Sequence, residues 1–439
     1  MSGIAEILLN LGMKVSGSDL RRSPITERLA QLGATIYEGH NATNIAGATV
    51  VVTSSAVAAT NPEVLEAHAR KIPVIQRAEM LAELMRLKYG IAIAGMHGKT
   101  TTTSMVASVL TAGGLDPTVV VGGRVDSMGS NARLGSTQYL VAEADESDRS
   151  FLKLSPILAV ITNLDREHMD CYHDMADVEN AFLDFIDRLP FYGAATACID
   201  NPLLRTILPL ARRRVYSYGA APEADYRMEL LDVPEGRFSR FQVTAQGTLL
   251  GPFELHVPGR HNILNATAAI AIAHQLDVPY EKIALGLSNF HGVDRRFQQR
   301  GVVGGITVVD DYGHHPTEIR ATLAAAKECG FKKIHVVFEP HRFTRTRDLR
   351  DQFAGAFIDA DSLLLLPIYA ASEPPIRGVN AEWLAQVIDS PKPRCVPDFA
   401  AAVETVLDEA APGDLILTLG AGNVSQLGPQ IVAALEAKG

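Results

Sequence analysis

The residues best suited to chemistry follow a short apolar run, where the chain reads Gly95-Met-His-Gly98-Lys99-Thr100-Thr. Two glycines let backbone N–H groups approach phosphate oxygens, a lysine supplies a point charge, and a hydroxyl at a helix start can bind Mg²⁺. The common phosphate-binding pattern has a glycine six places before the lysine, where this chain has Ile93. Because strand, turn and helix come in the required order, we interpret the segment as a phosphate-binding loop and not as a chance glycine-rich turn.

Acidic side chains follow the next predicted strand, 138–142. The sequence Glu143-Ala-Asp145-Glu146-Ser-Asp148 gathers four carboxylates at one strand end, and such a group repels itself unless a cation lies among the carboxylates. A solvated acidic loop would explain this cluster if it stood alone. Beside a phosphate-binding loop, a Mg²⁺ site that bridges nucleotide phosphates is the better interpretation.

A histidine follows the strand predicted at 157–162. His168 lies between Asp165 and Asp170 in the sequence. A lone histidine is more often structural than metal-binding, so a metal role for His168 rests on its acidic neighbours.

Further polar clusters lie in the second half of the chain. Residues 259–265 open an alanine-rich helix, where Asn and His side chains can cap the helix or contact a base. Arg295 and Arg296 form a pair that is either solvated or able to reach a phosphate. Two more clusters, 310–316 and 340–347, each end a predicted strand, and the arginines of the second can clamp a carboxylate.

Apolar strands alternate with helical stretches along most of the chain, which predicts α/β layers with mainly parallel sheets. In the first unit, Ile4, Ile7, Leu8 and Leu11 mark one face of a helix. The remaining predicted elements of this unit are a strand at 14–16, a helix at 25–32, a strand at 48–53, a helix at 62–70 and a strand at 73–75.

The strand pattern divides the rest of the chain into two larger units. We predict domains at 1–87, 88–296 and 297–439, with a β-rich stretch at about 213–257. The third unit has predicted strands at 306–309, 334–338, 362–366 and 414–418. The last of these leads into the turn Gly420-Ala-Gly-Asn423, at a strand end where such folds bind ligands.

Composition and charge argue against several classes of protein. The 439 residues carry a formal net charge of −10, which gives no general attraction for nucleic acid. The four cysteines form neither a metal motif nor a disulfide framework. No apolar run is long enough to span a membrane, and the N-terminus lacks the basic region of a signal peptide. We expect a cytoplasmic protein with no nucleic-acid or membrane partner.

Together these motifs resemble those of the Mur ligases of peptidoglycan synthesis. The matching segments occur in the family's order and span all three predicted domains: 95–101, 143–148, 168–170, 259–265, 295–297, 310–316 and 340–346. The resemblance implies a Rossmann-like N-terminal domain, a central P-loop ATPase-like domain and a Rossmann-like C-terminal domain. It also implies an ATP- and Mg²⁺-dependent ligase that activates a carboxylate as an acyl phosphate, with roles in cell-wall biogenesis, cell shape and cell division.

The resemblance also implies roles for individual residues. Those implied for catalysis are Lys99, Glu143, His168 and Arg296, and those implied for Mg²⁺ are Thr100, Glu143 and His168. The ATP contacts implied are Gly95, Met96, His97, Gly98, Lys99, Thr100, Thr101, Asn265, Arg296 and Asp310. Those implied for the UDP-sugar are Ser18, Asp19, His40, Ser54 and Ser55, and those for the amino acid are His314, Arg342 and Arg345.

The substrates implied are UDP-N-acetylmuramate and L-alanine. Some related ligases use a carbamylated lysine in the central domain, but here no lysine occurs between Lys153 and Lys282, which favours the alanine-adding branch. Ligases that attach a peptide or another amino acid remain alternatives, as does a truncated, weakly active nucleotide binder. A nicotinamide oxidoreductase is disfavoured, because no complete GxGxxG follows a strand and Lys99 would be idle. We expect a monomer or a weak homodimer.

The resemblance also gives an expectation for the start of the chain. Family members normally begin with an apolar strand and a glycine-rich turn before the helix that starts here at Met1. We therefore expect this chain to bind ATP but to bind UDP-N-acetylmuramate poorly. Adding roughly 15 to 20 upstream residues, enough for one strand and its turn, should restore that binding. Tight binding of the nucleotide sugar by the chain as given, measured by calorimetry, would contradict this expectation.

Overall fold

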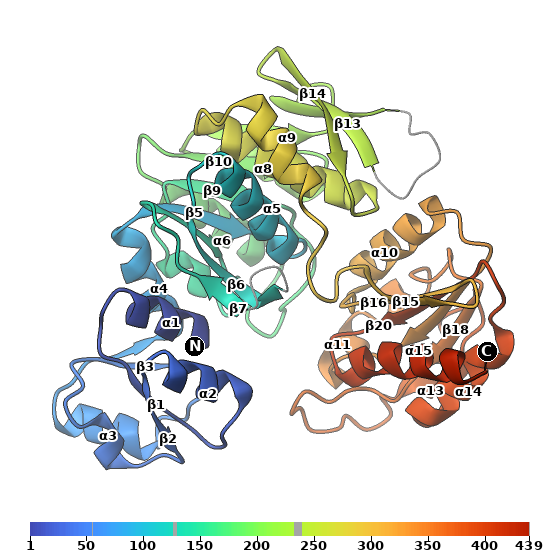
Figure 1. Cartoon of the computed structure of the whole chain (residues 1–439), viewed down its shortest axis with the longest axis horizontal. Helices are drawn as coiled ribbons and strands as arrows, with labels where there is room; N and C mark the ends of the chain where they lie inside the picture. Colours follow the sequence, from blue (N-terminus) through green and yellow to red (C-terminus); the bar gives the residue numbers. More distant parts are fainter. Residues whose placement is uncertain (55, 126–129, 232–238, 439) are drawn as a thin grey trace. The chain divides into compact units, whose positions relative to one another are not determined.

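The computed structural model of the chain describes residues 1–54, 56–125, 130–231 and 239–438 (Figure 1). The chain divides into two compact units. The first comprises Met1–Glu229, Gln242–Phe253 and Leu264–Asn289, and the second comprises Leu230–Phe241, Glu254–Ile263 and Phe290–Gly439. In the part that the structure describes, no helix has the length and apolar character needed to cross a membrane. The predicted boundary near residue 88 lies inside the first unit and stays a prediction.

The N-terminal part of the first unit contains short strands and helices in alternation. Its elements are α1 (Ser2–Asn10), β1 (Ser16–Asp19), α2 (Pro24–Gln31), β2 (Thr35–Glu38), η1 (Ala42–Ile45), β3 (Val51–Thr53), α3 (Pro62–Ala69), β4 (Val74–Gln76) and α4 (Arg77–Arg86). Among the described residues, β1 pairs with β2 and β3 pairs with β4, both in parallel.

Local sequence explains where these helices begin. Ser23 caps α2 and shares a capping box with Thr26, while Asn61 caps α3 and is followed by a proline at the first helical position. The amphipathic first helix is confirmed, because Ile4 and Ile7 are buried. The strand predicted at 14–16 lies further along, at β1, and β2 was missed because a four-residue strand with mostly exposed side chains gives no apolar pattern.

The central part of the first unit is built around a ten-stranded sheet of described residues. Its strands are β5 (Tyr89–Ala94), β6 (Thr118–Val125), β7 (Ser130–Arg133), β8 (Tyr139–Glu143), β9 (Leu158–Ile161), β10 (Ala194–Cys198), β11 (Val215–Gly219), β12 (Tyr226–Leu230), β13 (Ser239–Ala245) and β14 (Thr248–Leu255), in the order β14-β13-β12-β11-β10-β9-β5-β8-β6-β7. Its helices are α5 (Lys99–Ala112), η3 (Ser150–Lys153), α6 (Met175–Asp187), α7 (Pro202–Ile207), η4 (Leu208–Leu210), α8 (Arg260–Gln275) and α9 (Tyr280–Ser288).

Strand β5 is the middle of this sheet and pairs in parallel with β8 and β9. Its apolar residues 91–94 are fully buried, as expected for a parallel strand covered on both faces. Because β5, β8 and β9 run in the same direction, the residues that follow them meet at one edge of the sheet.

Helix α5, which follows β5, packs closely on α9. A Cβ on Gly286 of α9 would lie 2.6 Å from the Cα of Val109, and Ser108 Oγ donates a hydrogen bond of 2.7 Å to the Gly286 carbonyl. The glycine therefore allows the two helix backbones to touch, and the hydroxyl ties them together.

The second unit contains a six-stranded sheet of described residues in the order β15-β16-β20-β17-β18-β19. Its strands are β15 (Gln298–Val303), β16 (Ile306–Asp311), β17 (Ile334–Phe338), β18 (Ser362–Leu365), β19 (Arg394–Cys395) and β20 (Leu415–Leu419). Its helical elements are α10 (Pro316–Glu328), α11 (Phe343–Asp348), α12 (Arg350–Phe353), α13 (Ala381–Ala385), α14 (Phe399–Glu409), η5 (Asn423–Gln426) and α15 (Leu427–Lys438). The predicted strands are confirmed here, but the antiparallel edge strand β15, which is polar and interrupted by a bulge, was missed.

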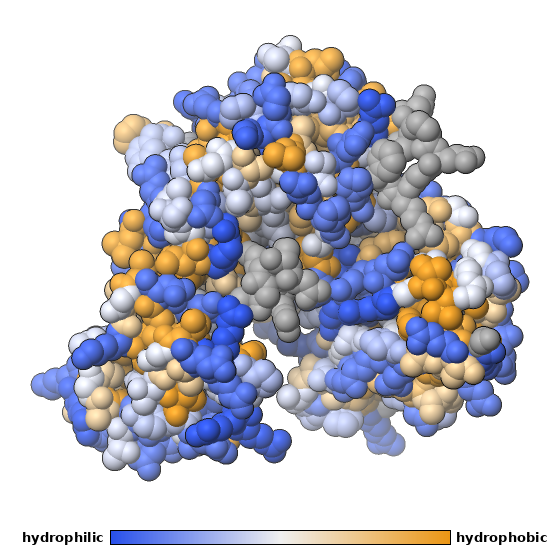
Figure 2. All heavy atoms as spheres, viewed as in Figure 1, coloured by the Kyte–Doolittle hydropathy of each residue, from blue (hydrophilic) through white to orange (hydrophobic). Residues whose placement is uncertain are grey.

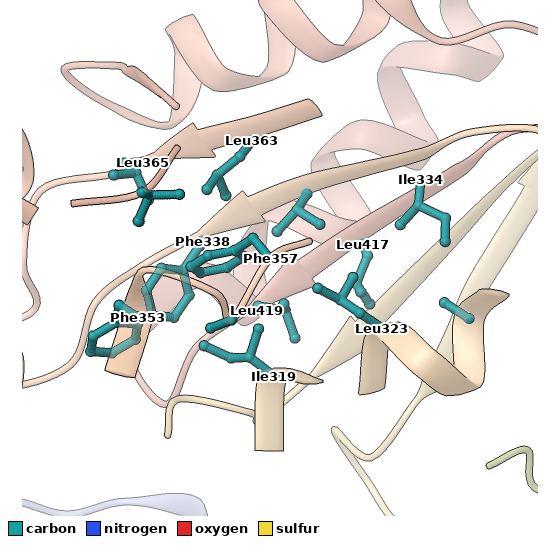
Figure 3. Close-up of a cluster of buried hydrophobic side chains, with 14 of the residues drawn as sticks. Ile319, Leu323, Ile334, Phe338, Phe353, Phe357, Leu363, Leu365, Leu417 and Leu419 are labelled. Atoms are coloured by element: carbon teal, nitrogen blue, oxygen red, sulfur yellow. The ribbon is translucent and has the colours of Figure 1, made fainter. Parts of the chain in front are cut away.

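Two apolar clusters cover the two faces of this sheet. Alternate strand residues point to opposite faces, so Phe338 and Leu417 join one cluster while Val337 and Ile416 join the other. The first cluster also includes side chains of α10 and α12 (Figure 3), and the second includes side chains of α14 and α15. The sheet is thus the middle layer of an α/β sandwich.

The face drawn in Figure 2 is largely polar, with apolar side chains in small groups. Exposed large apolar residues are spread along the chain, among them Leu20, Leu87 and Ile358. Scattered exposure of this kind is normal for a folded protein.

We expect Phe338→Ala to lower the free energy of unfolding of the second unit by about 3–5 kcal/mol, because it leaves a cavity in the core. Phe338 is fully buried, and its ring lies 5.3 Å from that of Phe357 and 5.8 Å from that of Phe353. Urea unfolding followed by fluorescence of Trp383, the chain's single tryptophan, measures the change. Ile358→Ala, at a side chain that is 67% exposed, is the control, and equal losses in both variants would contradict the packing described.

Candidate functional site

The strand, turn and helix predicted for the phosphate-binding loop are present as β5, residues 95–98 and α5. Gly95 has a φ of +126° and Gly98 a φ of +82°, values that favour glycine. A Cβ on Gly95 would also lie 2.0 Å from Thr162 Oγ1, and one on Gly98 would lie 2.9 Å from Asn265 Oδ1. Both glycines are therefore required for the backbone conformation and for space. The contact also brings the predicted ATP-binding residue Asn265 to the loop.

Two residues that follow β9 hold the loop in place. The Asn163 side chain accepts a hydrogen bond from the His97 N–H (2.8 Å) and donates one to the His97 carbonyl (3.0 Å), and Thr162 Oγ1 donates to the same carbonyl (2.6 Å). The Met96 N–H donates to the Asn163 carbonyl at 3.2 Å. The loop conformation is thus fixed by the protein itself.

The Lys99 ammonium group lies inside this loop. Its Nζ donates to the carbonyls of Gly95 (2.8 Å) and Met96 (3.2 Å) and to Oε1 of Glu146 (2.8 Å). The Glu146 side chain is 1% exposed, so the ion pair is shielded from water on the acid's side. A lysine held in this way must leave Glu146 to reach a phosphate.

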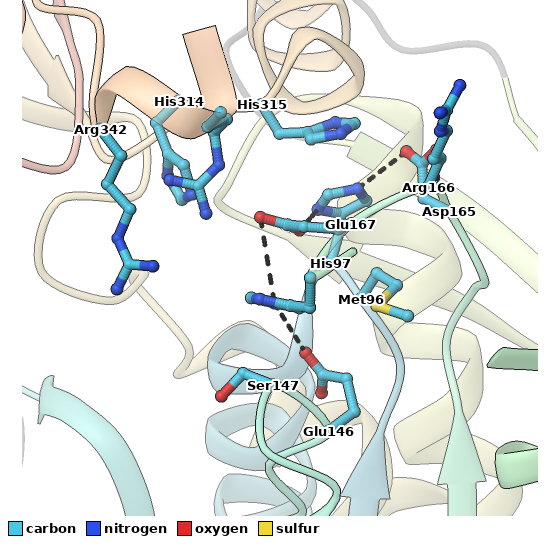
Figure 4. Close-up of polar contacts among 12 residues, drawn as sticks. Met96, His97, Glu146, Ser147, Asp165, Arg166, Glu167, His314, His315 and Arg342 are labelled. Atoms are coloured by element: carbon cyan, nitrogen blue, oxygen red, sulfur yellow. Dashed lines mark hydrogen bonds and ion pairs between the residues drawn. The ribbon is translucent and has the colours of Figure 1, made fainter. Parts of the chain in front are cut away.

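Histidine and acidic side chains lie near Glu146, among them Glu167 and Asp165 (Figure 4). His168 Nε2 lies 3.4 Å from Glu146 Oε1 and 4.0 Å from Glu167 Oε1. His97 lies between Asp165 and Glu167, with nitrogen–oxygen distances of 2.9 and 3.8 Å. The region therefore holds more carboxylates than lysines, and this excess of negative charge suits a bound cation.

Neighbouring charges and hydrogen bonds shift the pKa values of Lys99 and Asp145. Burial alone would lower the pKa of Lys99, but the carboxylates of Glu146, Glu143 and Glu167 raise it above its ordinary value. Burial works against the charged form of Asp145, yet hydrogen bonds from Ser147 hold its pKa below the ordinary value. Both groups are charged at neutral pH.

The three predicted metal-binding residues lie at the same edge of the sheet. Thr100 is in the first turn of α5, Glu143 ends β8, and His168 is in the turn after β9. The hydroxyl and the carboxylates are oxygen donors that fit Mg²⁺, whereas the His168 imidazole is a softer donor than this ion usually takes. Thr101 is buried in α5. The metal and ATP roles of these residues stay predictions.

The other two predicted ATP contacts belong to the second unit. The Arg296 side chain lies 3.4 Å from Glu318 and 5.1 Å from the ring centroid of Tyr312. Asp310 is fully buried, and its carboxylate lies 3.0 Å from Arg300 and accepts a 2.9 Å hydrogen bond from Thr418. Asp310 therefore has a structural role in its own unit, and an ATP contact from it stays a prediction.

The predicted amino-acid residues of the second unit lie close together. The rings of His314 and His341 are 5.7 Å apart, and Arg345 Nη1 lies 3.0 Å from His341 Nδ1. Arg342, drawn beside His314 in Figure 4, follows His341 in the chain and has a φ of +70°. Arg342 caps α11 and Arg345 lies in its first turn, so both follow β17 closely, and either guanidinium group could bind a carboxylate with two parallel hydrogen bonds.

Two of the predicted UDP-sugar residues, Ser18 and His40, lie beside the Glu63 carboxylate, which sequence reasoning missed. Ser18 Oγ donates to Glu63 Oε2 (2.8 Å) and lies 2.9 Å from His40 Nδ1. Asp19 ends β1 and Ser54 follows β3, while Ser55 lies outside the described residues. Glu63 is at the start of α3, far from any motif, so no sequence signal marked it.

Glu146 was also missing from the predicted site. It is one of four carboxylates in a short run, and the sequence alone gives no reason to prefer it over its neighbours. Its distinguishing property is that it is buried against Lys99, and this depends on how the turn after β8 folds.

Comparisons with known protein families cover all three segments of the chain. The Mur ligase middle domain matches residues 93–273, the Mur ligase family catalytic domain matches 1–89, and the Mur ligase glutamate ligase domain matches 295–422. The chain belongs to the Mur ligase family. The predicted three-domain Mur ligase architecture and α/β class are therefore correct.

Individual Mur ligases are similar to the chain over its whole length. The UDP-N-acetylmuramate–L-alanine ligase of Acidobacterium capsulatum is 66% identical, over 100% of this chain and 96% of that protein. The enzyme of the same name from Koribacter versatilis is 65% identical, over 100% and 95%. Among solved structures, UDP-N-acetylmuramate–alanine ligase from Thermotoga maritima has a TM-score of 0.81 at 28% identity, over 100% of this chain and 97% of that one.

A murein peptide ligase from Psychrobacter arcticus is also similar in structure. Its TM-score is 0.68 at 25% identity, over 99% of this chain and 96% of that one. The family therefore includes proteins of this fold with differently named activities.

We expect Glu146→Gln to lower the free energy of unfolding by about 3 kcal/mol. Removing one partner of a buried ion pair destabilises the protein by about 3–5 kcal/mol, because the other charge loses its partner. Lys99 is 18% exposed, so we expect a value at the low end of that range. Glu83→Gln breaks a solvent-exposed pair with Arg86 and should cost less than about 1 kcal/mol. Thermal unfolding followed by circular dichroism compares the two, and similar losses would show that the Lys99–Glu146 pair is not stabilising.

Proposed function

We propose that this chain joins L-alanine to the lactyl carboxylate of UDP-N-acetylmuramate, with ATP converted to ADP and phosphate, in peptidoglycan precursor synthesis. The observation that carries the proposal is the full-length identity of 66% to a ligase with that activity in its name. The loop around Lys99, with its acidic neighbours, supplies the machinery that phosphoryl transfer needs.

The first chemical step activates the carboxylate. A carboxylate oxygen of the nucleotide sugar bonds to the γ-phosphorus of ATP, the bond to the β–γ bridging oxygen breaks, and ADP leaves. Lys99 and the backbone N–H groups at the start of α5 stabilise the charge on the phosphoryl group as it transfers. Because Thr162 and Asn163 already hold the loop, the backbone donors need little reorganisation, whereas the Lys99 ammonium group must leave Glu146.

Mg²⁺, held by Thr100, Glu143 and His168, would supply further charge stabilisation to the phosphates when bound. Asn265 lies beside Gly98, where it can contact the nucleotide. Arg296 of the second unit is a further proposed ATP contact. An ATP contact from Asp310, which is fully buried against Arg300 and Thr418, stays a prediction.

The second chemical step forms the amide. The alanine nitrogen attacks the acyl carbon, the tetrahedral intermediate expels phosphate, and the nitrogen loses a proton. Arg342 and Arg345 orient the alanine carboxylate, with His314 beside them, so that the amine faces the acyl phosphate.

The N-terminal part holds the nucleotide sugar in this proposal. Ser18, Asp19, His40 and Ser54 line the proposed site. Glu63 accepts the hydrogen bond from Ser18, and its Oε1 lies 3.8 Å from His40 Nδ1, so it helps to fix both side chains. The proposed domains are 1–87 for the sugar nucleotide, 88–296 for ATP, and 297–439 for closing over ATP and the amino acid. We place the enzyme in the cytoplasm, which its four free cysteines support, as a monomer or weak homodimer.

The test is ADP release and product formation with ATP, Mg²⁺, UDP-N-acetylmuramate and each amino acid in turn. We expect turnover with L-alanine, and we expect Lys99→Ala to lower it by at least roughly 10²-fold. Lys282→Ala, at an exposed lysine, is the control and should be unaffected.

Two results would contradict the proposal. A preference for another amino acid, or for a murein peptide supplied in its place, would exclude the alanine-adding activity. Near-normal turnover by Lys99→Ala would exclude the phosphate-binding role of the loop.

A further inference from the structure

A hydrogen bond fixes the tautomer of His341 in the second unit. Arg345 Nη1 lies 3.0 Å from His341 Nδ1, and a guanidinium group can only donate. Nδ1 must therefore be the acceptor, and the imidazole proton lies on Nε2. Burial, with the nearby charges of His314 and Arg345, lowers the pKa of His341 to about 3, so this acceptor persists throughout the neutral range.

The ring of His341 is itself held by Tyr369. The two rings are stacked, with centroids 5.6 Å apart and an angle of 14° between their planes. The main chains on either side are also joined: the Arg342 N–H donates to the Tyr369 carbonyl and the Tyr369 N–H donates to the Pro340 carbonyl, both at 2.8 Å. The main chain of Tyr369 is thus bonded to the residues on either side of His341, which holds the two rings together.

Gly422 provides the space for the Tyr369 ring. A Cβ on Gly422 would lie 2.6 Å from Tyr369 Cγ and 2.3 Å from Glu339 Oε2. The φ of Gly422 is −96°, outside the left-handed region, and these two short distances show that the position also needs a residue without a side chain. Glu339 is buried and accepts a 3.0 Å hydrogen bond from the Val424 N–H, which holds the turn against the ring.

We propose that Gly422, Tyr369 and His341 form a chain of positioning residues that aims the Arg345 guanidinium at the carboxylate of the incoming amino acid. The inference rests on the proposed function and extends it, because none of the three was assigned to the amino-acid site. It also gives a role to the 420–423 turn, which supports the ring on which the histidine stacks. Ligand binding by this turn stays a prediction.

The geometry explains why such support is needed. An arginine side chain has many rotamers, and only a fixed guanidinium plane forms two parallel hydrogen bonds with a carboxylate. A neutral imidazole acceptor fixes that plane without adding a charge that would compete with the substrate. Misplacement of such a group by about 1 Å can cost up to roughly 10²-fold in rate.

The test uses the full chain and compares variants of Tyr369. Tyr369→Leu removes the stacking surface, and Tyr369→Phe keeps it. We expect Tyr369→Leu to raise the KM for L-alanine at least roughly tenfold, with the KM for ATP within about twofold of the unmodified chain. Tyr369→Phe should match the unmodified chain. If Tyr369→Leu leaves the KM for alanine unchanged, or raises both KM values equally, the proposal is wrong.

Variants of His341 separate stacking from hydrogen bonding, and they keep the test decisive if Tyr369→Leu does not fold. His341→Phe keeps a ring on Tyr369 but removes the acceptor, so we expect it to raise the KM for alanine. His341→Gln retains an acceptor oxygen and should rescue part of that loss. An unchanged KM for alanine in His341→Phe would overturn the proposal.

The activity of the unmodified chain separates a failure of the positioning chain from a failure of the proposed function. If it ligates alanine while all these variants keep its KM for alanine, the positioning chain is refuted and the proposed function stands. If it ligates no alanine at all, the proposed function fails and this inference fails with it.

Discussion

The charge of Lys99 is the constraint around which the central part of the first unit is arranged. An ammonium group that is largely removed from water needs compensating charge, and Glu146 provides it at 2.8 Å. The carbonyls of the loop supply its remaining hydrogen bonds, which requires the backbone conformation that Gly95 and Gly98 allow. When a nucleotide binds at the loop, its phosphate oxygens therefore compete with Glu146 for the same ammonium group.

The topology of the sheet brings the groups of this site together. The loop follows β5, Glu143 ends β8, and Thr162, Asn163 and His168 follow β9, so three neighbouring parallel strands deliver them to one edge. The second unit repeats this arrangement with other residues. There, Arg342 and Arg345 follow β17, Tyr369 follows β18 and Gly422 follows β20. In both units, strands fix the positions and the loops carry the chemistry.

Sequence reasoning succeeded where a property is encoded locally. The apolar run before Gly95 and the threonines after Lys99 predict a strand and a helix because both patterns are complete within a few residues. The nearly continuous apolar runs of β17 and β20 are equally local. It failed for β2 and β15, whose short polar segments are strands only because a neighbour pairs with them.

The candidate site shows the same division. Lys99, Glu143 and His168 lie in motifs, and their convergence follows from parallel strands. Glu146 and Glu63 contact residues far away in the sequence, Lys99 and Ser18. The residues next to them in the chain do not indicate these contacts, so they could not be predicted. Asp310 was expected at the nucleotide, yet its complete burial with Arg300 and Thr418 depends on the packing of the second unit.

The close packing of α5 on α9 limits how the loop can respond to a ligand. In many proteins a helix that carries a phosphate-binding turn could slide along its axis to adjust the turn. Here the close approach of Gly286 to the Val109 backbone and the Ser108 hydrogen bond oppose such a slide. Rotation of the Lys99 side chain disturbs none of these contacts and is fast compared with a helix movement. Helix α5 thus stays in place when a ligand binds, and the Lys99 side chain is the group that moves.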